Sequence, residues 1–213
     1  VGSDQLWEQA TNAILTACEQ LNLPHKVEEG EAAFYGPKLD FIFRDALKRE
    51  WQLGTVQVDY NLPQRFELEY VDENNSRQRP VMIHRAPFGS MERFIGILIE
   101  HFAGEFPAWL SPVQVLMIPV ADTHNDYANQ VAAELKKYGI RAQVDAGKGR
   151  MQKKIRDARE EYIPFMCIVG DRDIENNTVS VRLRTDEDLG AMSVADFISH
   201  VNRVCADKSM DLK

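Results

Sequence analysis

The stretch from Val81 to Glu100 constrains the fold of this chain more than any other part of the sequence. Residues Val81 to His84 are mostly apolar and predict the end of a buried strand, while Pro87 and Gly89 predict a turn. Apolar residues at helical spacing then predict a helix that begins around Met91. A strand, a glycine turn and a helix bring four polar residues into one neighbourhood: His84, Ser90, Glu92 and Arg93.

Two residues of this stretch suit a ligand better than they suit local stability. Gly89 has no side chain, so the backbone there can approach a ligand closely. Arg93 lies at the start of the predicted helix, where a positive charge opposes the helix dipole and costs roughly a few tenths of a kcal/mol. Local stability therefore does not explain Arg93.

The region before this stretch predicts a hairpin with unusual polar content. A helix from Asp4 to Leu21, capped by Ser3, is followed by alternating strands around 39–44 and 51–58. A turn at Asp45 to Arg49 makes these strands antiparallel neighbours. Several polar residues lie on or beside them: Tyr35, Lys38, Gln52, Thr55 and Gln57. Unpaired buried polar groups cost about 1–3 kcal/mol each, so these residues indicate either a ligand-filled cleft or the outward face of an edge sheet.

The second half of the chain alternates strands and helices. The order is strand 113–120, helix 125–138, strand 141–144, helix 151–161, strand 164–170, strand 178–184 and helix 194–206, which predicts a small α/β domain. No phosphate-loop or dinucleotide glycine motif is present. The segment FPAWLSP resembles an interdomain hinge in composition, so the predicted domains are 1–109 and 110–213. Asn61 to Pro80 predicts a strand pair with a solvated turn.

Charge is unevenly distributed along the chain. The formal net charge is −8, which argues against unselective coating of nucleic acid. Between Lys136 and Arg159, however, nine Lys or Arg residues stand against only Asp145 and Asp157. This stretch is either a local contact for a phosphate backbone or a solvated helix face.

No apolar run is long enough to span a bilayer, and no signal-peptide pattern opens the chain. The three cysteines, Cys18, Cys167 and Cys205, lack metal-ligand spacing, which indicates a reducing compartment. We therefore expect a cytoplasmic protein with no membrane partner.

Three groups of motifs carry a family resemblance that covers essentially the whole chain in order. HRAPFGSMER, from His84 to Arg93, resembles the third signature motif of class II aminoacyl-tRNA synthetases in its threonyl form. FYGPKLDF and WQLGTVQVDY are similar to the active-site sheet of that family. GDRDIENNTVSVRLR and DLGAMSV are similar to its anticodon-binding domain. The resemblance implies a partial α+β class II core with an antiparallel sheet, followed by an α/β mixed-sheet anticodon-binding domain.

The resemblance also implies roles for the polar residues of the first domain. Tyr35 would approach the amino group of threonine, and Lys38 would supply positive charge to its carboxylate or to the phosphates of ATP. Arg93 would stack on adenine and lie near the triphosphate, for which a planar guanidinium is suited. The remaining residues would line the adenylate pocket: Gln52, Thr55, Gln57 and Ser90.

A lone histidine at a strand end, such as His84, is usually a hydrogen-bonded core residue. The resemblance instead implies that it is one of three zinc (Zn2+) ligands, with an open position for substrate. We expect His84 and Arg93 to face the same cavity. The other two ligands are not found before His84 in this sequence. A prolyl or histidyl relative would have a zinc-free pocket.

In the second domain, Asp173 and Arg182 match residues that the family uses on the anticodon. A carboxylate can accept from a base amino group, and an arginine can donate to a guanine edge. Basic residues would hold the RNA backbone: Lys148, Arg150, Lys153, Lys154 and Arg156. The turn Ala146–Arg150 departs from the family pattern, so the resemblance implies no base contact from it.

The first two class II motifs are missing from the sequence, so Val1 is expected to lie in the middle of a catalytic domain. The chain would then be a fragment of a homodimeric threonine–tRNA ligase that uses ATP, Mg2+, threonine and tRNA(Thr). We expect no adenylation by this chain alone. The alternative is an inactive paralogue that acts as a tRNA-binding module.

Overall fold

The computed structural model describes residues 2–213. The chain divides into two compact units, one up to His101 and one from Phe102 to Lys213. Residues just after the division belong to the second unit, within which Glu105 forms an ion pair with Arg184 at 3.0 Å. The predicted domain limits, 1–109 and 110–213, stay a prediction for the whole protein.

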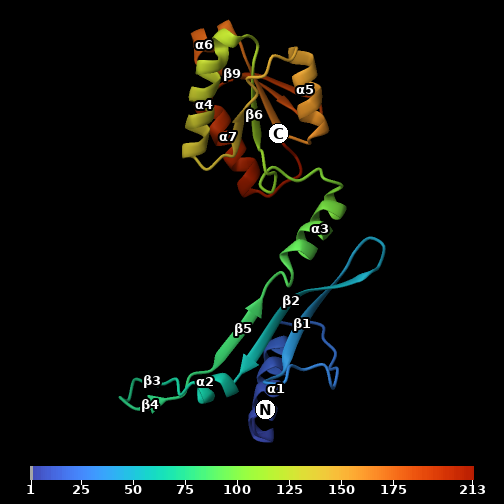
Figure 1. Ribbon diagram of the computed structural model, residues 1–213, viewed down its shortest axis with the longest axis vertical. Coiled ribbons are helices and arrows are strands. Elements are labelled where there is room, and N and C mark those ends of the chain that lie inside the picture. The colour runs from blue at the N-terminus through green and yellow to red at the C-terminus, as the bar shows by residue number, and fades with distance from the viewer. Residues whose placement is uncertain (1) are drawn as a thin grey trace. The chain divides into compact units, whose positions relative to one another are not determined.

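The first unit contains a three-stranded antiparallel sheet in the order β1-β2-β5 (Figure 1). Its elements are α1 (Asp4–Gln20), β1 (Lys38–Arg44), β2 (Glu50–Asp59), α2 (Asn61–Arg65), β3 (Tyr70–Val71), β4 (Arg77–Gln78), β5 (Met82–Ala86) and α3 (Met91–Phe102). The predicted hairpin, strand and helix are confirmed. The Ser3 cap is also confirmed, because its hydroxyl accepts from the Leu6 backbone N–H at 3.3 Å.

The segment that follows β2 corrects a sequence prediction. Residues 61–65 form the short helix α2 rather than a strand. Asp59 favours a helix here, because its Oδ1 accepts from the backbone N–H groups of Asn61 at 2.8 Å and Leu62 at 3.0 Å. The predicted strand pair is limited to β3 and β4, which form their own two-stranded sheet.

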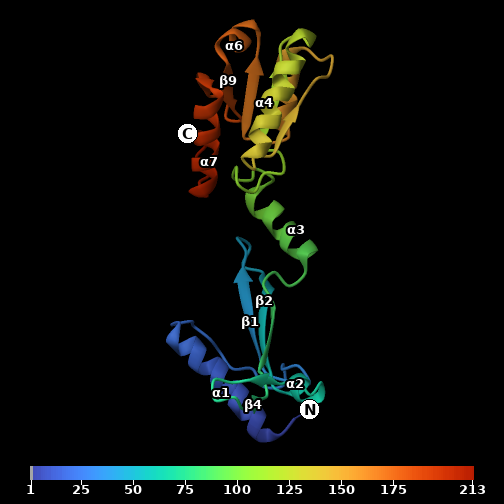
Figure 2. The same ribbon diagram turned by 90° about the vertical axis from the view of Figure 1, so that its left-hand side faces the viewer.

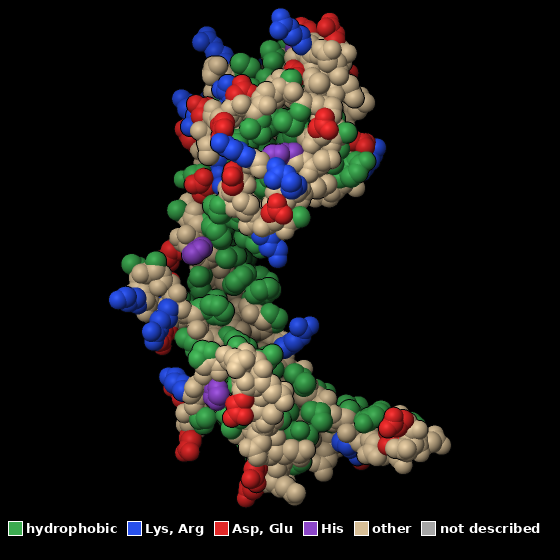
Figure 3. Space-filling model, turned by 180° about the vertical axis from the view of Figure 1, so that it is seen from behind, with side chains coloured by type: hydrophobic (Ala, Val, Ile, Leu, Met, Phe, Trp, Pro, Cys, Tyr) green, Lys and Arg blue, Asp and Glu red, His purple; other side chains and the backbone are tan. Residues whose placement is uncertain are grey.

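The first unit leaves much apolar surface uncovered. Among its described residues the buried apolar side chains are few: Ala10, Cys18, Leu53 and Pro63. Large apolar side chains of both the sheet and α3 are exposed, including Phe43, Ile83 and Ile95. Figure 3 shows apolar side chains at the surface of this unit. The sheet of this unit is therefore covered only in part, by α1.

The second unit is a five-stranded mixed sheet in the order β10-β9-β8-β6-β7. Its elements are β6 (Val115–Pro119), a 3-10 turn η1 (Asp122–His124), α4 (Asn125–Lys137), β7 (Ala142–Val144), α5 (Met151–Glu160), β8 (Phe165–Val169), α6 (Asp171–Asn176), β9 (Thr178–Leu183), β10 (Asp188–Ser193) and α7 (Val194–Ala206). Strand β6 pairs in parallel with β7 and β8, whereas β9 pairs antiparallel with β8 and β10.

Helices cover both faces of this sheet (Figures 1 and 2). Helices α4 and α7 pack with one face in a core that includes Phe165 and Phe197, whose rings meet edge to face at 5.9 Å. Helix α5 packs through Ile155 and Ala158 on the other face. The mixed α/β domain predicted from the sequence is confirmed, but α6 and β10 were missed.

Candidate functional site

Strand pairing gathers the predicted pocket residues on one face of the first sheet. Lys38 lies opposite Gln57, and Gln57 lies opposite His84 on the other side. Two residues further along β1, Asp40 lies opposite Thr55. Because side chains two residues apart on a strand point to the same face, these five residues share one surface.

Gln52 joins this face through an irregularity. The register between β1 and β2 shifts between Phe41 and Ile42, so that Gln52 lies opposite Ile42. A bulge of this kind re-aims side chains by one residue. Without it, Gln52 would point away from Thr55, whereas its amide lies 3.2 Å from the Thr55 hydroxyl.

Asp40 is the acceptor on which three predicted pocket residues converge. Its Oδ1 accepts from Gln52 and from Thr55, each at 2.7 Å. Its Oδ2 accepts from the Lys38 ammonium at 2.6 Å. Burial alone would raise the pKa of Asp40, but the hydrogen bonds from Lys38 and Thr55 outweigh burial and hold that pKa below its ordinary value. The Lys38 charge is therefore already paired.

His84 is held by a second carboxylate, Asp59, whose side chain is fully buried. The His84 Nε2 lies 2.8 Å from Asp59 Oδ2. An ionised carboxylate can only accept, so Nε2 carries the proton, and in the neutral imidazole Nδ1 keeps its lone pair. Burial opposes ionisation of Asp59, yet hydrogen bonds from His84 and from the start of α2 lower its pKa.

The surroundings of His84 test whether a metal ion fits there. Tyr35 contacts the imidazole edge with ring centroids 5.6 Å apart, and its hydroxyl donates to Gln57 at 2.9 Å. The described residues contain no group of three or more His, Cys, Asp or Glu that could hold a metal ion. His84 Nδ1 fits as a single zinc ligand, so this part of the chain supplies one ligand at most.

The turn before α3 approaches β2 closely. Gly89 has a φ of +61°, and a Cβ added there would lie 2.7 Å from the Leu53 carbonyl oxygen. Ser90 donates to Glu92 at 2.7 Å and accepts from the Arg93 backbone N–H at 3.3 Å. Arg93 donates through Nη1 to the Gln52 carbonyl at 3.2 Å. The shared cavity for His84 and Arg93 stays a prediction.

In the second unit, Asp173 has a structural partner for each of its oxygens. Its Oδ2 accepts from the Gly170 backbone N–H at 3.0 Å and so caps α6. Its Oδ1 accepts from the hydroxyls of Thr178 at 3.2 Å and Ser180 at 3.0 Å. Arg182 lies on the same face of β9, near Asp186 at 3.6 Å and Asp188 at 3.7 Å. Its Nε is buried without a hydrogen-bond partner among the described residues.

The basic residues before and within α5 lie in different environments: one is buried, some form ion pairs and others are exposed. Lys154 is buried, and its ammonium donates to the Asp145 carbonyl at 2.7 Å, so the prediction that it holds an RNA backbone is wrong. Lys153 pairs with Asp157 at 2.8 Å, and Arg156 approaches Glu160 at 3.7 Å. Lys148 and Arg150 are exposed and have no ion-pair partner within the described residues.

The sequence predictions missed both acceptor carboxylates, Asp40 and Asp59. Asp40 is two residues from Lys38 and therefore on its face, a signal that was available. Asp59 offered no such signal, because its partner His84 is 25 residues away.

Comparison with known proteins assigns both units. Residues 3–102 match the family described as the tRNA synthetase class II core domain (G, H, P, S and T). Residues 114–203 match the anticodon binding domain family. The threonine–tRNA ligase of Synechococcus elongatus is 56% identical over 208 residues, which cover 98% of this chain and 34% of that protein. That of Phocaeicola vulgatus is 56% identical over 92% of this chain and 30% of its own length.

A solved structure agrees with these matches. The RNA binding domain of threonyl-tRNA synthetase from Cryptosporidium parvum superposes with a TM-score of 0.82 at 34% identity, over 96% of this chain and 52% of that one. The two matched domains, in this order, are those of a class II aminoacyl-tRNA synthetase. The chain belongs to the threonyl-tRNA synthetase family, as its motifs indicated. It spans about a third of the length of the curated relatives that it matches.

Proposed function

We propose that the protein containing this chain is a threonine–tRNA ligase. The observation that carries the proposal is the single polar face of the first sheet, which bears Lys38, Thr55, Gln57 and His84 together. Its similarity to curated threonine–tRNA ligases supports the same assignment. No helix among the described residues has the length and apolar character needed to cross a membrane. A cytoplasmic location and a homodimer stay predictions.

The proposed reaction begins with attack of a threonine carboxylate oxygen on the α-phosphorus of ATP, which releases pyrophosphate. The threonyl group then passes from the adenylate to a hydroxyl of the terminal ribose of tRNA(Thr), which releases AMP. This chemistry needs placement and charge neutralisation rather than a protein nucleophile. Arg93, with Nε and Nη2 unpaired among the described residues, would supply charge to ATP alongside Mg2+. Lys38 would do so only after loosening its pair with Asp40.

His84 would contribute Nδ1 to a zinc site whose other ligands lie outside the described residues. When bound, zinc would supply a Lewis acid there, which would favour threonine over valine, because valine lacks the hydroxyl. Tyr35 lies beside the imidazole and would approach the amino group of the substrate. Gln57, held by the Tyr35 hydroxyl, would line the same end of the pocket.

The second unit would bind the anticodon at the face of β9 that bears Thr178, Ser180 and Arg182. Arg182 is the better candidate for a base contact, because its Nε is buried without a partner there. Asp173 is the weaker candidate, because it is buried and already accepts three hydrogen bonds within the unit. The exposed side chains of Lys148, Arg150 and Arg156 would contact the RNA backbone.

The test is threonine-dependent ATP–pyrophosphate exchange by the full-length protein, with valine and serine as competing substrates. We expect exchange with threonine, weak exchange with serine and none with valine. This chain alone should give no exchange but should retain salt-sensitive binding of tRNA(Thr). Binding of tRNA without exchange by the full-length protein would favour the inactive tRNA-binding paralogue instead.

A further inference from the structure

Helix α3 is attached to the first sheet by few buried contacts. None of its twelve residues is fully buried. At its start, Arg93 donates to the Gln52 carbonyl at 3.2 Å. A helix that buries little apolar surface depends on other contacts for its orientation.

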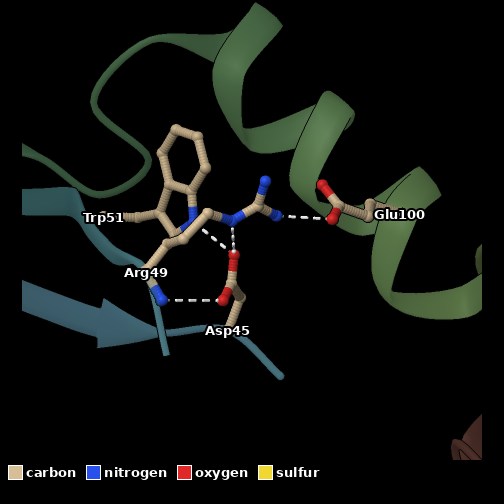
Figure 4. Close-up of polar contacts among 4 residues, drawn as sticks. All are labelled: Asp45, Arg49, Trp51 and Glu100. Atoms are coloured by element: carbon tan, nitrogen blue, oxygen red, sulfur yellow. Dashed lines mark hydrogen bonds and ion pairs between the residues drawn. The ribbon is translucent and has the colours of Figure 1, made fainter. Parts of the chain in front are cut away.

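A second attachment point lies near the end of α3 (Figure 4). There Glu100 accepts from Nη2 of Arg49, which belongs to the turn between β1 and β2. Arg49 in turn donates through Nε to Asp45 Oδ2 at 2.5 Å and through its backbone N–H to Asp45 Oδ1 at 2.9 Å. The indole N–H of Trp51 donates to Asp45 Oδ2 at 2.9 Å. The turn thus holds Arg49 in place before it reaches α3.

Because Asp45 holds Arg49 in place, we expect the ion pair between Arg49 and Glu100 to be stronger than an isolated surface pair. An exposed pair usually contributes little, because two long side chains must be ordered to form it. Here the guanidinium of Arg49 is already fixed by Asp45 and lies 5.4 Å from the Trp51 ring centroid. Hydrogen bonds from Trp51 and Arg49 lower the pKa of Asp45 to about 2, so Asp45 stays ionised at neutral pH. Binding Glu100 therefore costs little further ordering.

Helical geometry connects the two attachment points. Arg93 and Glu100 are separated by seven residues, about two turns at 3.6 residues per turn, so they lie on the same side of α3. Both side chains reach the β1–β2 hairpin, one at Gln52 and the other at Arg49. Two contacts along one side of a helix fix its rotation about its own axis, which a single contact cannot do.

We propose that Arg49 and Glu100 are positioning residues that hold α3 in the rotation at which Arg93 meets the Gln52 end of the polar face. The proposal rests on the proposed function, in which Arg93 binds ATP. Loss of the pair would let α3 rotate and would weaken ATP binding. It would leave the threonine end of the face, around Tyr35 and His84, unchanged.

The test uses Arg49→Ala, Glu100→Ala and the double variant in the full-length protein. We expect the KM for ATP in pyrophosphate exchange to rise about two- to fivefold in each single variant, with the KM for threonine unchanged. The double variant should be no worse than either single variant, because both remove one interaction. Glu100→Gln, whose amide oxygen can still accept, should recover part of the loss.

Arg44→Ala is the matched control. It removes the exposed pair of Arg44 with Glu50 at 2.6 Å in the same hairpin, and that pair does not touch α3. It should leave both KM values at the wild-type level. A parallel rise of both KM values in Glu100→Ala, or additive losses in the double variant, would overturn the positioning role.

Hydrogen exchange in this chain provides a second readout that does not depend on activity. Backbone amides of α3 between Arg93 and Glu100 should exchange about two- to fivefold faster in Glu100→Ala than in Arg44→Ala. Equal exchange in the two variants would refute the attachment itself. If the wild-type full-length protein lacks threonine-dependent exchange, the proposed function and the ATP effect fail together, and the attachment is then judged by this readout alone.

Discussion

Asp59→Asn is the substitution that tests the geometry around His84 most directly. In the protein, Asp59 Oδ1 accepts from two backbone N–H groups, and Oδ2 accepts from His84 Nε2. An asparagine would keep its oxygen toward the two backbone donors, because the opposite orientation would set its NH2 group against them. Its NH2 group would then face His84 Nε2, which can accept only if the imidazole proton moves to Nδ1.

The magnitude follows from these contacts. The hydrogen bonds to the two backbone N–H groups at the start of α2 are retained, so the loss of stability is limited to replacing a charge-assisted hydrogen bond by a neutral one, about 1–2 kcal/mol. The effect on zinc is larger, because Nδ1 loses the lone pair that would bind the metal. Loss of an outer carboxylate partner typically reduces metal affinity about 10- to 100-fold, and we expect a reduction in that range for the full-length protein.

Two assays check this prediction. Nitrogen-15 NMR of the histidine rings in this chain should show the Nε2–H tautomer for His84 in the wild type and the Nδ1–H tautomer in Asp59→Asn. Chelator competition on the full-length protein should show the weaker zinc binding. Asp72→Asn is the matched control, since Asp72 also accepts two backbone N–H groups through Oδ1, from Asn74 and Ser76, but has no histidine partner.

Two results would refute the reasoning. One is an Nδ1–H tautomer of His84 in the wild type, which would mean that Asp59 does not fix the proton. The other is unchanged zinc affinity in Asp59→Asn together with a changed tautomer, which would mean that His84 is not a ligand through Nδ1.

Further predictions concern the rest of the polar face, the turn and the second unit. Asp40→Asn should lower the free energy of unfolding of this chain by about 1–3 kcal/mol in denaturant, because Lys38 loses its ionic partner. Adenylation by the full-length protein should weaken as well. Gly89→Ala should lower the melting temperature, because the added Cβ would lie 2.7 Å from the Leu53 carbonyl at a φ of +61°, whereas Gly96→Ala, with nothing within 4 Å, should stabilise α3 by about 1 kcal/mol. Arg182→Ala should raise the KM for tRNA without affecting threonine adenylation, and an equal loss in both assays would contradict the division between the units. Because the pKa values of Asp40 and Asp59 are lowered from 3.8, their contribution to stability is present above that pH and is lost as pH falls through the folded values. The free energy of unfolding of the first unit should therefore fall less on acidification in Asp59→Asn than in the wild type, as measured by acid unfolding.

Much of the fold follows from local patterns in the sequence. The spacing of apolar residues defines α1, α3 and α7, and Ser3 marks where the first helix begins. Alternation and the turn at 45–49 define the β1–β2 hairpin. These predictions succeeded because periodicity and capping depend on residues close together in the chain. Helix α6 and strand β10 were missed, since the first lies in a polar turn-like run and Gly190, with its φ of +79°, interrupts the second.

The candidate site also has a part that the sequence predicted and a part that only the structure revealed. The motif residues from Tyr35 to Arg93 could be named from the sequence because each belongs to a recognisable run. Only the tertiary structure showed that Asp40 and Asp59 are the acceptors that hold them, and that Lys154 is buried against Asp145. Such pairings depend on strand register, on a bulge that turns Gln52 to the polar face, and on contacts between residues far apart in the chain. A sequence pattern records which residues are present, whereas folding decides which of their charges and hydrogen bonds meet.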